Sequence, residues 1–168
     1  MEIDAPVPQG PDRLVKPLAT RKPEYFLCGP IVFSAVSQEF VNTLDAKWWP
    51  YLLRRVSPIA TRTRDNTAFP GEELVVATTM FPHPTVEGYE DVSGFVLASV
   101  NGVRVKSLHH AAELVRDAKG KHIELRFAER GVEDVVIRTD ALGRATEAVL
   151  ADNGIRSRSS AGLKDVWK

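Results

Sequence analysis

The sequence predicts an α+β domain with an antiparallel β-barrel or sandwich, a helical insertion and a C-terminal helix. Three observations support this fold class. About six apolar, β-branched stretches typical of strands are mixed with three or four stretches of helical periodicity. Asn101-Gly102 stands between two strand candidates and is a strong hairpin signal, because both central positions of a type I′ turn need positive φ. Long βαβ repeats are missing from the sequence, so the strands are expected to pair in antiparallel fashion.

The N-terminal stretch is rich in proline, which removes amide donors and restricts the backbone. We therefore expect residues 1–23 to form a linker that contains one short strand at residues 13–16. The folded domain is expected at residues 24–154, with a helical insert at about residues 37–71, and a polar tail at residues 155–168. The prolines of the linker are Pro6, Pro8, Pro11, Pro17 and Pro23.

In the first half of the domain, residues 25–30 are expected to form a loop that contains Gly29-Pro30 and leads into a strand at residues 31–36. Ser37 is a suitable N-cap for a helix that continues to about residue 56, with a kink or break at Pro50. Residues 57–71 combine prolines, arginines and an asparagine, and we expect them to form an exposed loop.

In the second half of the domain, the sequence pattern predicts strands, one hairpin-to-helix unit and a last helix. Ser107 caps a helix to about residue 118, which Gly120 ends, and Asp140 caps another that stops at Asn153-Gly154. The strands are expected at residues 74–80, 94–100, 103–105, 122–128 and 132–139.

Composition excludes several functions. The chain has 168 residues, with 22 Lys and Arg against 22 Asp and Glu, and so lacks the basic surplus typical of nucleic-acid or anionic-membrane binding. No apolar run is long enough to span a bilayer, and the acidic, proline-interrupted first residues are not typical of a signal peptide. Cys28 is the only cysteine, so an internal disulfide is impossible, and we interpret it as a buried hydrophobic residue.

The motifs of catalysis are also missing from the sequence. None of the nine serines stands in a glycine-rich nucleophile turn, and no Gly-x-Gly or Walker pattern occurs. His109 and His110 are adjacent and would point about 100° apart on a helix, so they cannot share one metal ion. We expect no cofactor, no metal and no catalysis by this chain. Two alternatives stay open: a serine hydrolase that uses Ser157 or a neighbouring serine, and nucleic-acid binding through the arginines of residues 54–64.

The remaining possibility is peptide binding. A strand introduced by a glycine-containing loop, next to a short helix with small apolar residues, is the arrangement that β-augmentation grooves need. The candidate groove residues are Gly29, Ile31, Val32, Phe33, Leu108, Ala111, Ala112 and Val115. A second candidate surface contains Trp48, Trp49 and Tyr51, because adjacent tryptophans on a helix are hard to bury in one core.

A family resemblance runs from about Arg13 to Asp165. The order and spacing of its motifs resemble the second, C-terminal PDZ domain of Do-like (Deg/HtrA-type) trypsin-like serine proteases. The matching pieces are Leu14-Val15-x-Pro17, Pro23-x-Tyr25, Gly29-x-Ile31-Val32-Phe33, Ser37, Glu73-Leu74-Val75-Val76, Gly88-Tyr89-Glu90, Val100-Asn101-Gly102 with Val105-x-x-Leu108, Val135-Val136-Ile137, Ala145-Thr146 and Ile155-x-Ser157.

The resemblance implies a noncatalytic interaction module that mediates oligomer assembly or regulation and binds unfolded or C-terminal peptides. Its partners would be an upstream protease domain or sister subunits of a serine endopeptidase located in the cell envelope, the periplasm or an organelle. A stand-alone PDZ-like adaptor is the alternative. Pro30 departs from the pattern, because a carboxylate-binding loop needs amide donors at this point. The loop Met80–Tyr89 is a candidate for occluding the groove.

Overall fold

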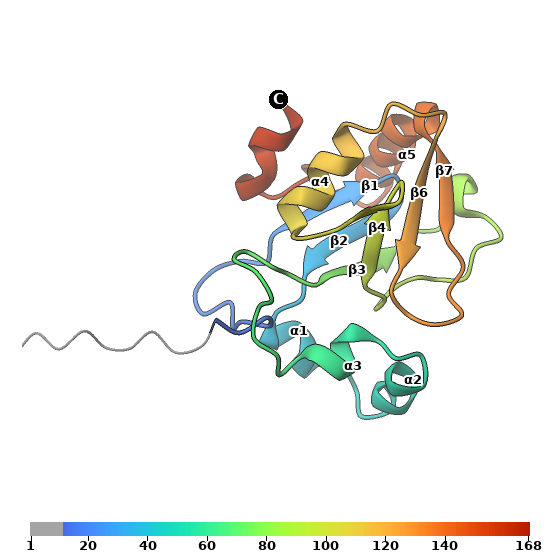
Figure 1. The fold of residues 1–168 in the computed structure, drawn as a ribbon. Helices are drawn as coiled ribbons and strands as arrows, with labels where there is room; N and C mark the ends of the chain where they lie inside the picture. Colours follow the sequence, from blue (N-terminus) through green and yellow to red (C-terminus); the bar gives the residue numbers. More distant parts are fainter. Residues whose placement is uncertain (1–11) are drawn as a thin grey trace, which may run out of the picture.

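The computed structural model describes residues 12–168, which form two antiparallel sheets with helices packed around them (Figure 1). One sheet has the order β1-β2-β3 and the other the order β5-β4-β6-β7. The strands are β1 (Tyr25–Cys28), β2 (Ile31–Ala35), β3 (Val75–Met80), β4 (Leu97–Val100), β5 (Val103–Arg104), β6 (His122–Phe127) and β7 (Val135–Arg138). The α-helices are α1 (Gln38–Thr43), α2 (Trp48–Arg54), α3 (Pro58–Arg62), α4 (Leu108–Arg116) and α5 (Thr139–Asp152), and the 3₁₀ helices are η1 (Pro84–Val86) and η2 (Ala161–Trp167).

This arrangement confirms the α+β class with antiparallel sheets. The strands expected at residues 74–80, 94–100, 103–105, 122–128 and 132–139 are all present within a few residues. Asn101 and Gly102 both have positive φ, 48° and 77°, as a type I′ hairpin turn requires. Between the two sheets, Val76 and Val96 form an isolated antiparallel bridge. The sheets do not close into a barrel, so the description of a sandwich is the better one.

Strand β1 corrects the expected loop at residues 25–30. Tyr25 pairs with Ser34 and Cys28 with Ile31, so β1 and β2 form a tight hairpin. Gly29 occupies the left-handed region at the turn, with φ of 58°, which glycine adopts at low cost. The aromatic and apolar residues of this stretch therefore pair as a strand, and Gly29-Pro30 serves as the hairpin turn.

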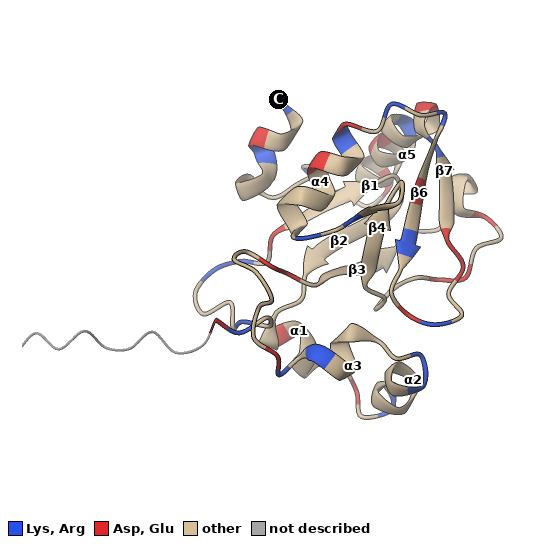
Figure 2. Ribbon diagram, in the orientation of Figure 1, with Lys and Arg blue, Asp and Glu red and all other residues tan. Residues whose placement is uncertain are grey.

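Two hydrophobic clusters hold the fold together. The main cluster lies between the sheets, α4 and the C-terminal segment, and Phe26, Phe33 and Phe95 are its largest fully buried side chains. A second cluster joins the helical insert to β3 and includes Leu52, Ile59 and Val76. Charged residues occur outside β1, β2 and β3, which carry none (Figure 2). No helix of residues 12–168 is both long and apolar enough to cross a bilayer.

The helical insert contains three short helices, and two expectations about it are corrected. The break falls at residues 44–47, and Pro50 stands in the first turn of α2, where the missing amide has no intrahelical acceptor to lose. Residues 57–71 are not an exposed loop, because they contain α3. Ser57 and Ile59 are fully buried, and the Ser57 hydroxyl accepts the Ile59 amide.

Both ends of the described chain contribute to the clusters. Leu14 and Val15 are buried in the second cluster, and residues 13 and 16 form isolated bridges, to Asn66 and Ser37, where a short strand was expected. Leu163 and Val166 are buried in the main cluster, although a polar tail was expected there. Pro6, Pro8 and Pro11 lie outside the described residues. The domain boundaries at residues 24 and 154 stay a prediction.

Candidate functional site

Helix α4 forms one wall of the candidate groove. Ser107 caps it by accepting the His110 amide at 3.2 Å, as the sequence predicts, and Arg116 stands in its last turn. The four candidate residues of this helix, Leu108, Ala111, Ala112 and Val115, share one buried face and belong to the main cluster. They hold α4 against the strands, and their small side chains let the helix approach closely.

Strand β2 does not offer a free edge. Its residues pair with β1 on one side and with β3 on the other, so Phe33 faces Phe26 and Ala77 in register. The structure thus places Ile31, Val32 and Phe33 in the centre of a sheet, where an added peptide strand cannot reach their backbone groups. The edge that a peptide could use belongs to β1.

The Gly29-Pro30 turn lies against β7 and α5, so it is not part of the groove beside α4. Both residues are buried, and a Cβ added at Gly29 would lie 3.7 Å from Ile137 and from Leu142, the latter on α5. The turn therefore packs against β7 and α5. Because it is enclosed and Pro30 has no amide, it is not arranged as a nest for a terminal carboxylate.

The outer edge of β1, which does not face β2, pairs with the C-terminal segment, which we define as residues 157–167. The Leu27 amide donates to the Arg158 carbonyl at 2.8 Å, and the Ser160 amide donates to the Tyr25 carbonyl at 2.9 Å. These bonds flank an antiparallel bridge between Phe26 and Ser159. An extended tripeptide thus adds to the sheet in the manner of β-augmentation.

After Ser160 the C-terminal segment continues as η2 and packs along α4 (Figure 1). Leu163 and Val166 are 1% and 2% exposed, and Nη1 of Arg116 on α4 donates to the Val166 carbonyl at 3.0 Å. The Trp167 ring lies 6.2 Å from the Phe26 ring. Helix α4 and β1 therefore enclose the C-terminal segment between them.

Sequence reasoning missed this segment as part of the site. Its apolar residues Leu163, Val166 and Trp167 have helical spacing, which was a usable signal, but the serines and basic residues around them favoured a solvated tail. Tyr25 and Ser160 are also 135 residues apart, so no local pattern connects them.

The electrostatics of the groove are dominated by burial. Burial raises the pKa of the Cys28 thiol to about 12, so it stays protonated, in agreement with its interpretation as a buried hydrophobic residue. Burial lowers the pKa of Arg158, although the charge of Glu147 opposes this effect. The Arg158 guanidinium lies 3.9 Å from the centroid of the Trp167 ring, within the range of a cation–π interaction. The Ser157 hydroxyl donates to the Ser159 carbonyl, which is not the environment of an activated nucleophile.

The three residues of the second candidate surface do not share one environment. Trp48 is 44% exposed, Trp49 packs against the second cluster, and Tyr51 stacks on Phe95 with ring centroids 6.1 Å apart. The Arg55 guanidinium covers the Tyr51 ring at 4.9 Å. The apolar residues that α2 and its C-terminal end leave exposed are Trp48, Leu53 and Val56, which we call the α2 patch.

Two buried carboxylates support the helical insert: Glu129 joins it to the sheets, and Glu72 accepts hydrogen bonds from within it. Glu129 accepts the Ser57 hydroxyl at 2.7 Å and the Val96 amide at 3.0 and 3.1 Å. Burial raises the pKa of Glu129, and the bonds from Ser57 and Val96 oppose that shift. Glu72 accepts from Arg62 and from the Ala68 amide. Its burial favours the neutral acid, but these bonds outweigh it and lower its pKa. Neither carboxylate was singled out from the sequence.

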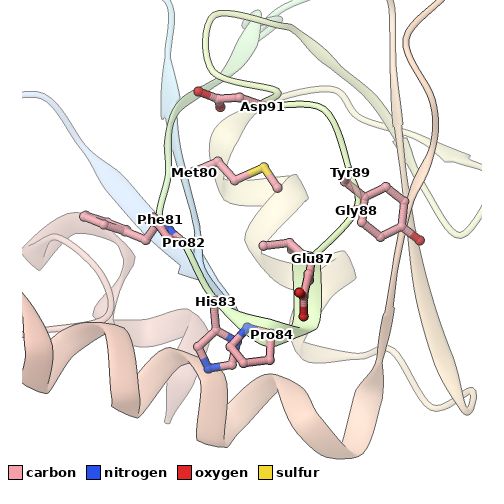
Figure 3. Close-up of a pocket in the computed structure, with 10 residues that line it drawn as sticks. Met80, Phe81, Pro82, His83, Pro84, Glu87, Gly88, Tyr89 and Asp91 are labelled. Carbon is pink, nitrogen blue, oxygen red and sulfur yellow. The ribbon is translucent and has the colours of Figure 1, made fainter.

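The loop after β3 does not occlude the groove. It surrounds a cavity of about 660 Å³, and Figure 3 shows Met80 pointing into the ring of the loop and Phe81 away from it. The Tyr89 hydroxyl bonds to the backbone of Val136, so the loop packs on β7. The expectation that Met80–Tyr89 fills the groove is therefore wrong. Within residues 12–168, His, Cys, Asp and Glu side chains form no group that could hold a metal ion.

Comparison with known proteins agrees with this geometry. Residues 16–162 match the model of a PDZ domain family. The chain belongs to the PDZ domain family. It is 26% identical over 152 residues to the chloroplastic protease Do-like 2 of Arabidopsis thaliana, which covers 87% of the chain and 23% of that protein. It is 23% identical over 135 residues to the mitochondrial Do-like 12 of the same plant, covering 80% of the chain and 22% of that protein.

This PDZ domain is therefore related to Do-like proteases, as the motifs in the sequence indicated. The chain spans less than a quarter of the length of these relatives.

Proposed function

We propose that this PDZ domain is a noncatalytic protein-interaction module of a Do-like serine protease, where it corresponds to the second, C-terminal PDZ domain. Its role is to mediate assembly or regulation of the protease and to bind peptide segments. The observation that carries peptide binding is the pairing of an extended segment with the β1 edge beside α4. The similarity to Do-like 2 over 87% of the chain supports the protease context.

For peptide binding, the site consists of the Tyr25 and Leu27 backbone groups and the wall of α4. Edge backbone groups supply affinity in β-augmentation, and side-chain pockets supply specificity. Of the groove candidates from the sequence, the four residues of α4 support the wall. Gly29 shapes the hairpin, while Ile31, Val32 and Phe33 support β1 from the next strand.

For assembly, we assign the α2 patch as the contact surface. Trp48 is a large aromatic side chain that the domain leaves 44% exposed, and Leu53 on the same helix is 57% exposed. Tryptophan is enriched among the residues that dominate binding energy in interfaces. Arg54, which is exposed at the end of α2, would orient a partner with acidic groups, whereas Arg55 is already paired with Glu90.

Light scattering on the full-length protein tests the assembly role. Trp48→Ala is expected to shift the oligomer to smaller species, because it removes the central anchor. Val103→Ala is the matched control, since Val103 is 48% exposed and lies on β5 of the four-stranded sheet, outside the α2 patch. An oligomer that both variants leave intact would exclude the α2 patch from assembly.

Isothermal titration of the chain with unfolded polypeptides and with C-terminal peptides tests the binding role. Binding of at least one class is expected.

The reading frame around the coding sequence tests the protease context, because a trypsin-like domain should lie upstream. A serine-directed fluorophosphonate probe should leave the chain unlabelled, and labelling that Ser157→Ala abolishes would contradict the noncatalytic role.

A further inference from the structure

The C-terminal segment occupies the position on β1 that an incoming peptide needs. Its residues 158–160 use the Tyr25 carbonyl and the Leu27 amide, which are the backbone groups that face outward at this edge. We propose that the C-terminal segment is an intramolecular ligand that closes the groove, and that the groove binds internal peptide segments of the same chemistry when this segment is released. The proposal rests on the peptide-binding role and specifies its ligand class and regulation.

The ligand class follows from how the resident segment is seated. The chain continues on both sides of Ser159, back toward α5 and onward into η2, so the paired residues are internal to the chain. The Gly29-Pro30 turn is enclosed by β7 and α5. The groove therefore suits an internal segment and lacks the features that would select a free C-terminal carboxylate.

The side chains of the resident segment define its pattern. An extended stretch with a basic residue, Arg158, comes first, and a helical turn with two apolar anchors, Leu163 and Val166, follows it. The aromatic Trp167 then folds back under the Arg158 guanidinium. A ligand of this class has a basic residue, a small residue at the position of Ser159, and apolar residues five and eight positions after the basic one.

The resident segment is held imperfectly, which favours exchange. The Nε atom of Arg158 and the Nε1 atom of Trp167 are buried without a hydrogen-bond partner among the described residues. Buried polar groups that lack partners weaken an interface, because they lose water and gain nothing in return. An external segment that buries no such unpaired polar atoms would bind the groove more tightly than the resident one does.

The tether compensates for this imperfection. Residues 153–156 connect the C-terminal segment to α5, so the segment is present at an effective concentration on the order of millimolar. An external peptide has to compete with it, and its apparent affinity falls by the fraction of chains whose groove is open. Weakening the resident segment should therefore strengthen binding of an external peptide.

A single substitution can weaken the pairing with little change to the core. Ser160 has φ of −64°, which proline adopts, and Ser160→Pro removes the amide that donates to the Tyr25 carbonyl. It also removes the hydroxyl that accepts the Tyr25 amide at 3.2 Å. Ser160→Ala is the matched control, because it removes the hydroxyl alone and keeps the amide.

The probe is an N-acetylated peptide of residues 155–168 with Trp167→Phe, labelled at its N-terminus for fluorescence anisotropy. The protein is the full chain with Trp48→Phe and Trp49→Phe, so Trp167 is its single emitting tryptophan. We expect Ser160→Pro to bind the peptide about tenfold or more tightly than the parent and Ser160→Ala. In the parent, excess peptide should shift the Trp167 emission to longer wavelength as the segment moves into water.

Equal affinity of the peptide for the parent, Ser160→Pro and Ser160→Ala, together with unshifted Trp167 emission, would overturn the proposal that the C-terminal segment is an intramolecular ligand. The peptide would then bind at another place, and the proposed function would survive. Absence of binding to every form would overturn this proposal, and titration with unrelated unfolded polypeptides then decides the proposed function separately. If circular dichroism shows that Ser160→Pro is unfolded, the parent decides alone: a red shift with excess peptide supports displacement, and constant emission at millimolar peptide overturns it.

Discussion

The helical insert and the C-terminal segment both pack on the sheets through apolar side chains, but their polar attachments differ. The insert is attached through the buried carboxylate of Glu129, which accepts from Ser57 on the insert and from Val96 on the sheet side. The C-terminal segment is attached through the apolar side chains of Leu163 and Val166 and through backbone bonds to β1. The polar attachment of the insert is thus a carboxylate that can be protonated, and that of the C-terminal segment is a pair of backbone hydrogen bonds.

This difference separates two roles within one domain. Apolar contacts and backbone bonds accept many sequences, so the β1 edge can exchange one segment for another. A buried carboxylate needs matched donors at defined positions, and removing any of them leaves a polar group without a partner. The insert is therefore expected to be a fixed part of the domain, and the C-terminal segment an exchangeable one.

Leu163→Ala should have the largest effect on stability. The side chain is 1% exposed, and truncating a buried leucine costs about 3 kcal/mol through lost burial and a residual cavity. Urea unfolding followed by circular dichroism measures the loss. Leu53→Ala, at a side chain 57% exposed, is the control and should change stability by less than about 0.5 kcal/mol. A loss of under about 1 kcal/mol for Leu163→Ala would mean that the segment docks only weakly in the native state.

Glu129→Ala should come next and should loosen the insert. The Ser57 hydroxyl and the Val96 amide lose their acceptor inside the protein, which costs about 2 kcal/mol. Glu133→Ala in the same hairpin is the control, because Glu133 is exposed. Hydrogen exchange should show faster exchange in α2 and α3 and unchanged exchange in β1. Uniform acceleration across the domain would argue against an attachment specific to the insert.

The free energy of unfolding should depend on pH in opposite directions through the two buried carboxylates, and this effect should be smaller than that of Glu129→Ala. Burial raises the folded-state pKa of Glu129 above its ordinary value of 4.5, so the folded state binds this proton more tightly than the unfolded state. Its contribution to stability is therefore complete below pH 4.5 and falls as the pH rises toward the raised pKa. Glu129→Gln should remove this decline in urea unfolding measured from pH 4 upward.

Glu72 should behave in the opposite sense. Its folded-state pKa is lowered, because the bonds from Arg62 and Ala68 outweigh burial, so its contribution is present above pH 4.5 and is lost as the pH falls below it. Glu72→Gln should flatten the acid side of the stability curve. If both variants flattened the same side, the assignment of opposite shifts would be wrong.

The smallest effect is expected where neither attachment is involved. Arg126 and Asp134 form an exposed ion pair at 2.9 Å on the β6–β7 hairpin. Exposed pairs contribute little because water and salt screen them. Arg126→Ala should leave the urea midpoint within experimental error, and a clear drop would show that surface charge matters more here than the buried contacts.

Much of the fold follows from local patterns. The Asn101-Gly102 turn, the Ser107 cap and the buried face of α4 could all be predicted, because each depends on residues within one turn or one helix. The family could also be recognised from the order of such motifs. The fold of residues 57–71 was mispredicted, since the short α3 is stabilised by burial of Ile59 and by Ser57, and its own helical pattern is weak.

The candidate site was only half predictable. The buried face of α4 was predicted and its role as a groove wall stays a prediction, while the edge was assigned to the strand at residues 31–33, because the sequence cannot say which strand of a sheet is outermost. That position depends on the register of β1 between β2 and Ser159. Likewise, the alternation of His122–Phe127 predicts a wet face, but nothing in it predicts that Glu129 just beyond is buried.

The sequence by itself determined the α+β class, the hairpin-to-helix unit and the lack of a basic surplus, because composition and short-range patterns carry this information. Only the tertiary structure decided that the polar C-terminal residues close the β1 edge and that the Glu129 carboxylate holds the insert on the sheets. These features join residues far apart in the chain, such as Tyr25 with Ser160 and Ser57 with Glu129, and such pairs form only when packing brings their backbones together.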